Sequence, residues 1–327
     1  MLAAVVFATL FSFSRGRYTI GWEEIGHFFL SLFKNGSPDL SSEEFQVFYY
    51  IRLPRVILAF VVGASLCASG TVFQGIFRNP LASPDILGVA SGCSFGAALG
   101  IMLDTSLPYD VQFFSFFFGL IAMLLVYFLS GLRKNGNLVM LILAGMIVSA
   151  LFCSGISLLK YLADPLDQLP AIVFWIMGGL HRASWLTLKP LLYLATPLLT
   201  VLLLLSWKLN ILAQGEEEAE ALGLNVKRYR LALVLINTLL IAASVSVCGS
   251  IGWIGLMIPH ISRMLVGHDH LYSLPFSMVS GGVFLMLLDT LARSISSSEI
   301  PVSIITSITG ALFLAFLING RRGKSWL

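Results

Sequence analysis

The chain has 327 residues, of which 57% are hydrophobic and 11% are charged, and its mean hydropathy is +0.89. Soluble domains carry about 25% charged residues. The composition therefore excludes an ordinary water-soluble fold and predicts an all-α, polytopic membrane protein that forms a single domain over residues 1–327. The formal net charge of +3 is small and scattered, which argues against a nucleic-acid partner.

The first fourteen residues, MLAAVVFATLFSFS, form an apolar segment with no basic residues before it and no cleavage site after it. We interpret this segment as a membrane span and not as a secretory signal peptide. It is short, because about 20 residues are needed to cross the ~30 Å hydrocarbon layer. Two explanations stay open: the first span is frayed, or the natural N-terminus begins earlier.

Charge-free runs predict the other spans, because a charged side chain at a helix centre raises the free energy of insertion by about 2.5–3.5 kcal/mol. The long run Leu231–Ser262 is divided in two because CGSIGWIGLMIPH contains three glycines and a proline. With the first segment, this gives about ten transmembrane helices, the others being Val56–Phe77, Ile86–Leu103, Val111–Leu132, Asn135–Leu159, Pro190–Trp207, 231–248, 256–266, Leu271–Leu288 and Ile300–Gly320.

The apolar stretch Leu169–Leu180 is about half a membrane thickness long and is predicted to be a short re-entrant or interfacial helix packed on protein. Ten spans place both termini on one side. With cytoplasmic termini, eleven basic residues fall inside and four lie in short outer loops, as the positive-inside rule favours. The long outer segment Arg15–Arg55 adds five more outside and weakens this count. Its amphipathic pieces are expected on the outer surface.

A dense polar hairpin interrupts the apolar chain at about residues 210–230. Negative charge in a first helical turn suits the helix dipole, and Gly223 is placed to end the helix because glycine readily adopts positive φ. Composition leaves open whether this is a solvated loop or a docking element for a soluble cytoplasmic partner. The four glutamates of this hairpin are Glu216, Glu217, Glu218 and Glu220.

Six longer segments follow one another in a recognisable order. They are IRLPRVILAFVVGASLCASGTVFQGIFRNPLASPDILGVASG from residue 51, LILAG from 141, FWIMGGL from 174, GEEEAEALGLNVKRYR from 215, GSIGWIGLMIPHISRMLVGHDH from 249 and LLDTLARSISSSEIPVSIITSITGALFLAFLI from 287. Together they resemble permeases of the iron-siderophore and vitamin B12 family of ABC importers. The resemblance covers nearly the whole chain from residue 51 and little of the first fifty residues.

The resemblance implies a machine of several subunits. Such permeases sit in the bacterial inner membrane as homodimers with one pathway between the two copies, two ATPase subunits on the cytoplasmic side and a periplasmic substrate-binding protein outside. The chain would be a transport subunit and not an enzyme, with no catalytic residues, metal or cofactor of its own, because the ATPase partner binds ATP and magnesium. The ATPase-coupling residues implied by the match are Gln214, Gly215, Glu216, Glu217, Glu218, Ala219, Leu222 and Gly223.

The C-terminal letters GRRGKSWL contain Gly323-Lys324-Ser325, which imitate the end of a phosphate-binding loop. The loop pattern requires glycine at position 318, where this chain has Ile318, and a following helix. The chain ends at Leu327, so we reject this site and read the basic tail as an inner-face anchor.

Three arginines match family positions that face acidic residues on the binding protein: Arg52, Arg55 and Arg293. Arginine suits such docking because it is permanently charged and bidentate. The alternatives are that these side chains reach lipid headgroups or that Arg293 pairs with Asp289 one helical turn earlier.

The resemblance places a cytoplasmic gate near Asn79 and Leu81, with Asn137 and Leu138 opposite through a weaker match. The alternative for Asn79-Pro80 is ordinary turn chemistry.

Other polar and small residues are given structural roles. His260 is expected to be a histidine at a helix end, and His268 and His270 lack a full ligand set for zinc. The four cysteines lie in apolar spans without CxxC spacing and are expected to be buried and free. Glycines at every fourth position, from Gly88 to Gly100, predict a smooth face for helix packing.

The leading interpretation is a permease subunit that imports a metal chelate of the ferric siderophore, haem or cobalamin class. One alternative is the same machine carrying an oxyanion such as molybdate or tungstate. A second is a stand-alone secondary transporter, which would need buried midplane carboxylates; Asp289 is the one acid well inside a span, near its outer end. An intramembrane enzyme is disfavoured because neither HExxH nor facing aspartates are found.

Overall fold

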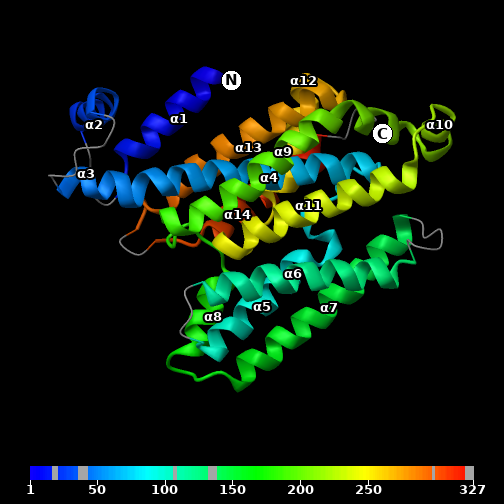
Figure 1. Cartoon of the computed structure of the whole chain (residues 1–327), viewed down its shortest axis with the longest axis horizontal. Helices are drawn as coiled ribbons and strands as arrows, with labels where there is room; N and C mark the ends of the chain where they lie inside the picture. Colours follow the sequence, from blue (N-terminus) through cyan, green and yellow to red (C-terminus); the bar gives the residue numbers. More distant parts are fainter. Residues whose placement is uncertain (17–20, 36–42, 106–108, 132–137, 297–298, 321–327) are drawn as a thin grey trace.

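A computed structural model of the chain describes residues 1–16, 21–35, 43–105, 109–131, 138–296 and 299–320. All regular structure in this part of the chain is helical (Figure 1). The helices are α1 (Leu2–Ser14), α2 (Trp22–Asn35), α3 (Glu43–Val47), the π-helix η1 (Phe48–Arg52), α4 (Leu53–Ile76), the 3₁₀ helix η2 (Pro84–Leu87), α5 (Val89–Leu103), α6 (Asp110–Leu129), α7 (Leu138–Leu162), α8 (Gln168–Ile176), α9 (Trp185–Gln214), α10 (Glu216–Ala221), α11 (Val226–Cys248), α12 (Ile254–Val266), α13 (His270–Ala292) and α14 (Val302–Gly320).

Each of the ten segments predicted as spans contains a helix over most of its described residues. By length and composition, α4, α6, α7, α9, α11 and α13 can cross a membrane, and α1, α5, α12 and α14 are shorter apolar helices. The all-helical, polytopic fold is thus confirmed, while the count of ten crossings stays a prediction. The short helix expected near residues 169–180 is α8, and the expected break in the long run lies between α11 and α12.

Helix α4 is the centre of the bundle and is buried along most of its length. It packs on α9, α11, α12 and α13. Close approach is possible because glycines face each other: a Cβ on Gly63 would collide with the Gly281 carbonyl, and one on Gly70 with the Gly255 carbonyl. Small residues play this role widely in membrane helices.

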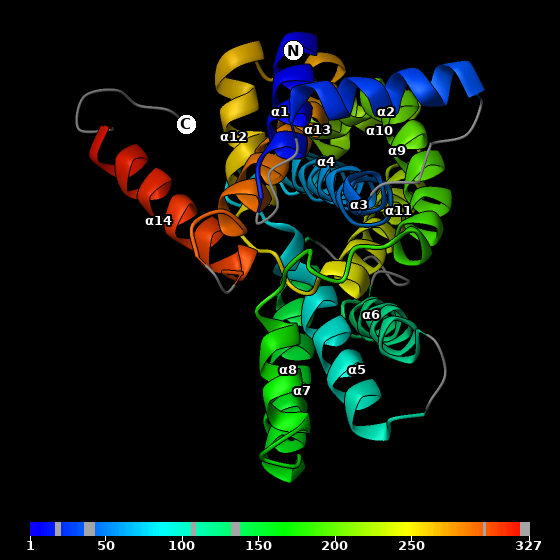
Figure 2. The same cartoon turned by 90° about the vertical axis from the view of Figure 1, so that its left-hand side faces the viewer.

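Of the four glycines predicted to form one face, Gly92, Gly96 and Gly100 pack against α6, whereas Gly88 precedes α5 and packs against Gly145 and Ser149 of α7. A Cβ added to Gly92 would lie 2.7 Å from the Phe118 carbonyl oxygen, and one on Gly96 would collide with the Phe114 carbonyl. Helices α5 to α8 form a lobe that projects from the rest of the bundle (Figure 2).

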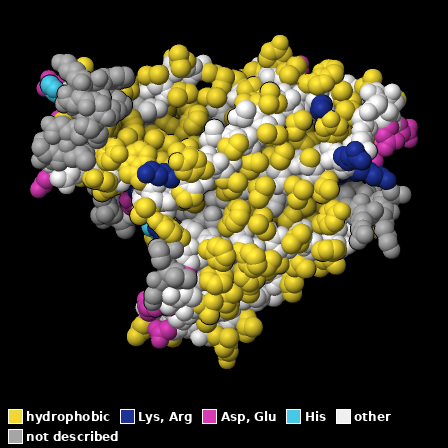
Figure 3. All heavy atoms as spheres, in the orientation of Figure 1, with side chains coloured by type: hydrophobic (Ala, Val, Ile, Leu, Met, Phe, Trp, Pro, Cys, Tyr) yellow, Lys and Arg dark blue, Asp and Glu magenta, His cyan; other side chains and the backbone are white. Residues whose placement is uncertain are grey.

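The two ends of the bundle differ in character. The acidic hairpin around α10 lies at one end, and α2 and α3 lie at the other, where α2 crosses the bundle transversely (Figure 1 and Figure 2). Between these ends the visible surface is mostly hydrophobic (Figure 3), with large exposed side chains such as Phe117 on α6 and Leu204 on α9. Such a flank is compatible with lipid contact.

Candidate functional site

A polar groove is lined by residues of η2, α5, α7, α8 and α14 and of the segment between α11 and α12. Figure 2 shows where α14, α7 and α8 lie. Its volume is about 540 Å3. One basic and one acidic side chain, Lys160 and Asp85, reach it. The remaining polar lining is largely hydroxyl, from Ser91, Ser94, Ser157, Ser250, Ser303 and Ser307. A lining of this kind offers many weak hydrogen bonds and little fixed charge.

Three helices begin beside this groove. Helix α5 starts at Val89 after Gly88, whose φ of 70° places it in the left-handed region. Helix α14 starts at Val302, whose N–H donates to the Gly178 carbonyl at 3.2 Å. Helix α12 starts at Ile254 after the break in the long run. First turns carry partial positive charge, so these helix dipoles favour negative charge beside the groove, where Asp85 lies.

Trp253 occupies the break between α11 and α12 and lines the groove. Its backbone has φ 71° and ψ −37°, and the Ile254 N–H donates to the Gly252 carbonyl at 2.9 Å. This is a γ-turn with positive φ, a rare and strained geometry. The indole lies against α14, since a Cβ on Gly310 would be 2.6 Å from Trp253 Cε3.

The sequence-based predictions include no groove residue. A signal does exist within single helices: Ser91 and Ser94 on α5, and Ser303 and Ser307 on α14, recur at helical spacing and so share a face. Which faces meet depends on the tertiary arrangement, and local spacing does not specify it.

The predicted coupling hairpin is a helix that stands out from one end of the molecule (Figure 1). Ala219 is fully buried and packs with Ile211 and Val226, which fixes α10 on its two neighbouring helices. Gly223 ends the hairpin helix with φ 80°, as predicted. Of the eight coupling residues, Gly215 and Ala219 are buried, whereas the exposed ones are Gln214, Glu216, Glu217, Glu218, Leu222 and Gly223.

Charge and exposure at this hairpin fit both alternatives, a solvated loop and a docking element. Arg230 forms an ion pair with Glu216, and Glu217 and Glu218 are exposed, with the Glu218 carboxylate lying against Gly215. Leu222 is 63% exposed beside them. A single exposed leucine is common on protein surfaces, so the coupling role of the hairpin stays a prediction.

The predicted gate residues Asn79 and Leu81 are exposed in the turn after α4. The Leu81 N–H donates to Asn79 Oδ1 at 2.9 Å, so the turn chemistry offered as the alternative is present. Leu138 is the first residue of α7, and Asn137 lies outside the described residues. The gate itself stays a prediction.

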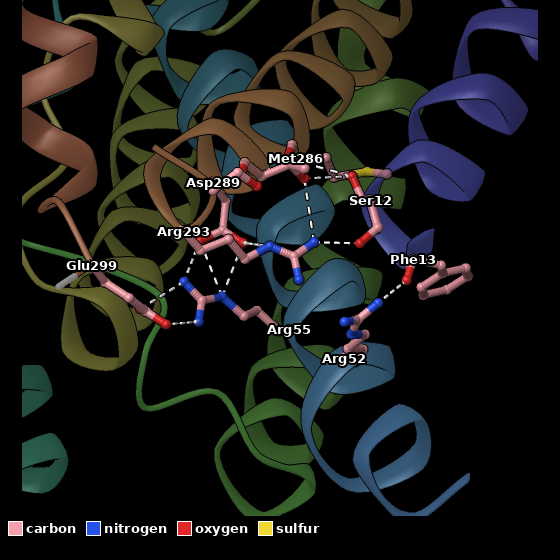
Figure 4. A network of polar contacts seen from close by, with 10 residues as sticks. Ser12, Phe13, Arg52, Arg55, Met286, Asp289, Arg293 and Glu299 are labelled. Carbon is pink, nitrogen blue, oxygen red and sulfur yellow. Dashed lines mark hydrogen bonds and ion pairs between the residues drawn. The ribbon is translucent and has the colours of Figure 1, made fainter. Parts of the chain in front are cut away.

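The three arginines predicted to dock a binding protein are buried, with exposed fractions of 3% for Arg52 and 6% each for Arg55 and Arg293. Figure 4 shows the contacts that hold them. Arg55 donates through Nε and Nη2 to both carboxylate oxygens of Asp289, at 2.9 and 2.8 Å, and to Glu299 at 3.0 Å. In the single chain the Arg55 guanidinium is therefore engaged by carboxylates of this chain itself.

The other two arginines cap the C-terminal end of α1. Arg52 donates to the Phe13 carbonyl and Arg293 to the Ser12 carbonyl (Figure 4), where the last carbonyls of a helix lack partners. Arg293 Nε also lies 3.7 Å from Asp289 Oδ2, which is the alternative pairing considered for it. Sequence reasoning missed these roles because the acceptors belong to distant segments. Docking stays a prediction.

The remaining candidate residues make packing contacts and form no metal site among the described residues. His260 lies in the middle of α12 and not at a helix end as expected, and its ring packs edge-on to Phe313, with centroids 6.0 Å apart. No group of three or more metal-ligating side chains occurs in the part of the chain that the structure describes. Partial burial, then repulsion from Arg182, lowers the pKa of His181 near the outer arginines. All four cysteines are free, as predicted, but Cys153 is exposed in the groove instead of buried.

Membrane-length helices around a polar groove place the protein among the multi-pass membrane permeases. Residues 4–319 match the FecCD transport family, and the chain belongs to that family.

Relatives and a solved structure agree with this assignment. The molybdate import system permease protein MolB of Haemophilus influenzae is 42% identical over 98% of this chain and 94% of its own length. The hemin transport system permease protein HmuU of Yersinia pestis is 41% identical over 83% of each chain. The cobalamin import system permease protein BtuC of Halobacterium salinarum is 40% identical over 84% of this chain and 74% of its own.

The solved structure is an inward-facing ABC transporter assigned to the metal-chelate type. It superposes with a TM-score of 0.87 at 39% identity and covers 98% of this chain and 97% of that one. The chain is therefore a permease of the ABC importer type.

Proposed function

We propose that cargo crosses the membrane along the hydroxyl-lined groove between α5, α7 and α14. The observation that carries this proposal is a polar groove of about 540 Å3 in a bundle whose outer flanks are apolar. Polar lining at membrane depth is stable only beside protein, water or a polar ligand, because lipid offers no hydrogen bonds.

The same proposal assigns the work of ATP hydrolysis to separate subunits. The exposed acidic face of α10 is the element that they would grip on the cytoplasmic side, and the arginine-rich end opposite would lie near the periplasmic binding protein. This chain then acts as a transport subunit, not as an enzyme, in a bacterial inner membrane with both termini in the cytoplasm.

A second copy of the chain would complete the pathway. The groove is open on its outer side in the single chain, and α14 presents an apolar stripe directly beside its groove-lining serines. This stripe comprises Ile304, Ile308 and Leu312, one helical turn apart and 42–66% exposed. A homodimer built on this stripe would close the groove between two copies.

The cargo class follows from the chemistry of the lining. The lining has six hydroxyls, one base, Lys160, and one acid, Asp85. Hydroxyls and Lys160 can donate hydrogen bonds to oxygen at the periphery of a cargo, a property that ferric chelates and molybdate share. We propose a metal chelate, because the hemin and cobalamin permeases and the metal-chelate type structure are all similar to this chain. The oxyanion alternative is favoured by one observation, the likeness to MolB over 98% of the chain.

Uptake measurements test both the mechanism and the cargo. The chain is reconstituted into liposomes with its cognate ATPase and binding protein, and uptake of a labelled ferric chelate, haem, cobalamin and molybdate is measured with and without ATP. We expect ATP-dependent uptake of one class only. ATP-independent uptake driven by an ion gradient would instead establish the secondary transporter, which the Arg55–Asp289 pair disfavours because it neutralises the carboxylate.

The native cysteines offer a direct test of the groove. Cys153 is exposed in it, whereas Cys67, Cys93 and Cys248 are buried. A polar thiol reagent should therefore label Cys153 alone, and labelling should slow uptake and fall in the presence of cargo. Cys153→Ser should be unlabelled and insensitive. Full transport by the labelled wild-type chain would exclude the groove as the pathway.

A further inference from the structure

Asn210, in the last turns of α9, lies just before the coupling hairpin, and both polar atoms of its side-chain amide form hydrogen bonds. Nδ2 donates to Asp269 Oδ1 at 2.6 Å. Oδ1 accepts from the His270 backbone N–H at 2.8 Å and lies 2.8 Å from His270 Nδ1. Because a carboxylate only accepts, the amide nitrogen must face Asp269, and the His270 ring must donate from Nδ1.

Asp269 joins this cluster to the start of α13. The same Oδ1 atom accepts from the Leu271 N–H at 2.8 Å and so caps the helix. Hydrogen bonds from Leu271 and then Asn210 lower the pKa of Asp269, which keeps it an acceptor at neutral pH. The end of α9 and the beginning of α13 are therefore held as one unit, although they lie 60 residues apart in sequence.

His270 carries the contact onward to α4. It is 5% exposed, and a Cβ added to Gly75, in the last turn of α4, would lie 2.7 Å from its Nε2. Because the ring packs directly against the backbone of a glycine, the two helices are in close contact and cannot move independently at this point.

Gln74, beside Gly75, ties the end of α4 to the turn predicted as the gate. Its side-chain Nε2 donates to the Ala82 and Leu256 carbonyls, both at 3.1 Å. Its backbone carbonyl accepts from the Asn79 N–H at 3.2 Å. Contacts therefore run without a gap from the coupling hairpin through α9, the start of α13 and the end of α4 to residues 79–82.

We propose that Asn210, Asp269 and His270 are positioning residues that transmit displacement of the coupling hairpin to the end of α4 and the gate turn. The inference rests on the proposed function, because it requires an ATPase that moves α10. A cluster that only held helices together would affect stability. A transmitting cluster must also affect how much transport each ATP drives.

The test compares coupling ratios, defined as cargo molecules imported per ATP hydrolysed, in liposomes that hold the full complex. Asn210→Leu removes all three contacts with little change in volume. We expect the ratio to fall about tenfold, a usual size for coupling between sites, while ATPase binding and hydrolysis persist. Asn225→Leu is the matched control, since Asn225 caps α11 in the same hairpin but outside this cluster.

His270→Asn separates holding from transmission. The asparagine amide can still donate to Asn210 in place of Nδ1, but the ring edge that reaches Gly75 is gone. We expect a modestly lowered unfolding temperature, because the missing ring leaves a cavity, and a lowered coupling ratio. The double variant Asn210→Leu/His270→Asn should have a coupling ratio no lower than the lower of the two single changes, because both break one link.

Several results would overturn the inference. Wild-type coupling in His270→Asn, or losses that add in the double variant, would show that the cluster does not transmit. If Asn210→Leu does not insert into the membrane, the coupling ratio of His270→Asn alone tests the inference. Failure of the proposed function looks different, because the wild-type chain itself would then show no ATP-dependent uptake.

Discussion

Arg55 is a buried cation with two acidic partners. Its guanidinium meets Asp289 and Glu299 together, with side-chain exposures of 8% and 2% for Arg55 and Asp289. Removing one partner of a buried ion pair leaves an uncompensated charge, which lowers the free energy of unfolding much more than removing both partners does. The pair therefore joins α4 to α13, and substituting one partner alone should destabilise the chain.

Arg55→Leu should lower the free energy of unfolding by about 3–5 kcal/mol, because Asp289 would stay buried without a counter-charge. Arg55→Leu/Asp289→Leu should recover part of that loss, because Arg293 then loses its own ion pair with Asp289. Denaturation midpoints in detergent measure both, with the exposed Arg228→Leu as a control that should stay within about 0.5 kcal/mol. A stable Arg55→Leu chain with weak binding-protein affinity would instead support the docking role.

At the scale of single elements, α10 carries a sharp prediction. Replacing Glu216, Glu217 and Glu218 with lysine should reduce ATP-driven uptake more than about tenfold, since like charges facing each other at an interface raise the free energy of association by several kcal/mol. The protein should still insert, because the hairpin lies at the end of the bundle.

The matched control reverses two acids at the opposite end, Glu23 and Glu24 on α2, which are also exposed. Uptake should be normal in that variant. Normal uptake in the α10 variant, measured under the same conditions, would remove the coupling role from this helix.

The spans were predictable from sequence because lipid imposes a simple condition, a charge-free run of sufficient length. The break before α12 was predictable because glycine and proline act locally. Helix ends were less so: α9 runs from Trp185 to Gln214, whereas its charge-free run is Pro190–Trp207. Ser184 caps it through a capping box, and the helix continues past both lysines into the interfaces.

Long-range contacts set the limit of prediction for the sites. The coupling hairpin is contiguous in sequence and could be delimited. The burial of Arg55 depends on a carboxylate 234 residues away, and the Asn210 cluster on one 59 residues away. The groove depends on faces of α5, α7 and α14 that spacing alone cannot bring together.

At the scale of the whole molecule, the open groove predicts how two copies meet. Ile308→Cys should form an inter-chain disulfide on mild oxidation in membranes, because α14 would lie at the dimer axis. Leu204→Cys is the control, being 76% exposed on α9 but not in the groove lining. Cross-linking is read as a dimer band on a non-reducing gel. Efficient cross-linking at position 204 and none at 308 would place the interface elsewhere.

The length of α9 has a consequence for the membrane itself. Its 30 residues, at about 1.5 Å each, give a rod of roughly 45 Å, against a hydrocarbon layer of ~30 Å. The extra length of about 15 Å is roughly that of the two headgroup regions, which bring the bilayer to about 40–45 Å, so the acidic turn is expected at the membrane surface. A thicker bilayer would cover more of this helix and bring the acidic turn closer to the headgroups. We therefore expect the transport rate to depend on the acyl-chain length of the lipid.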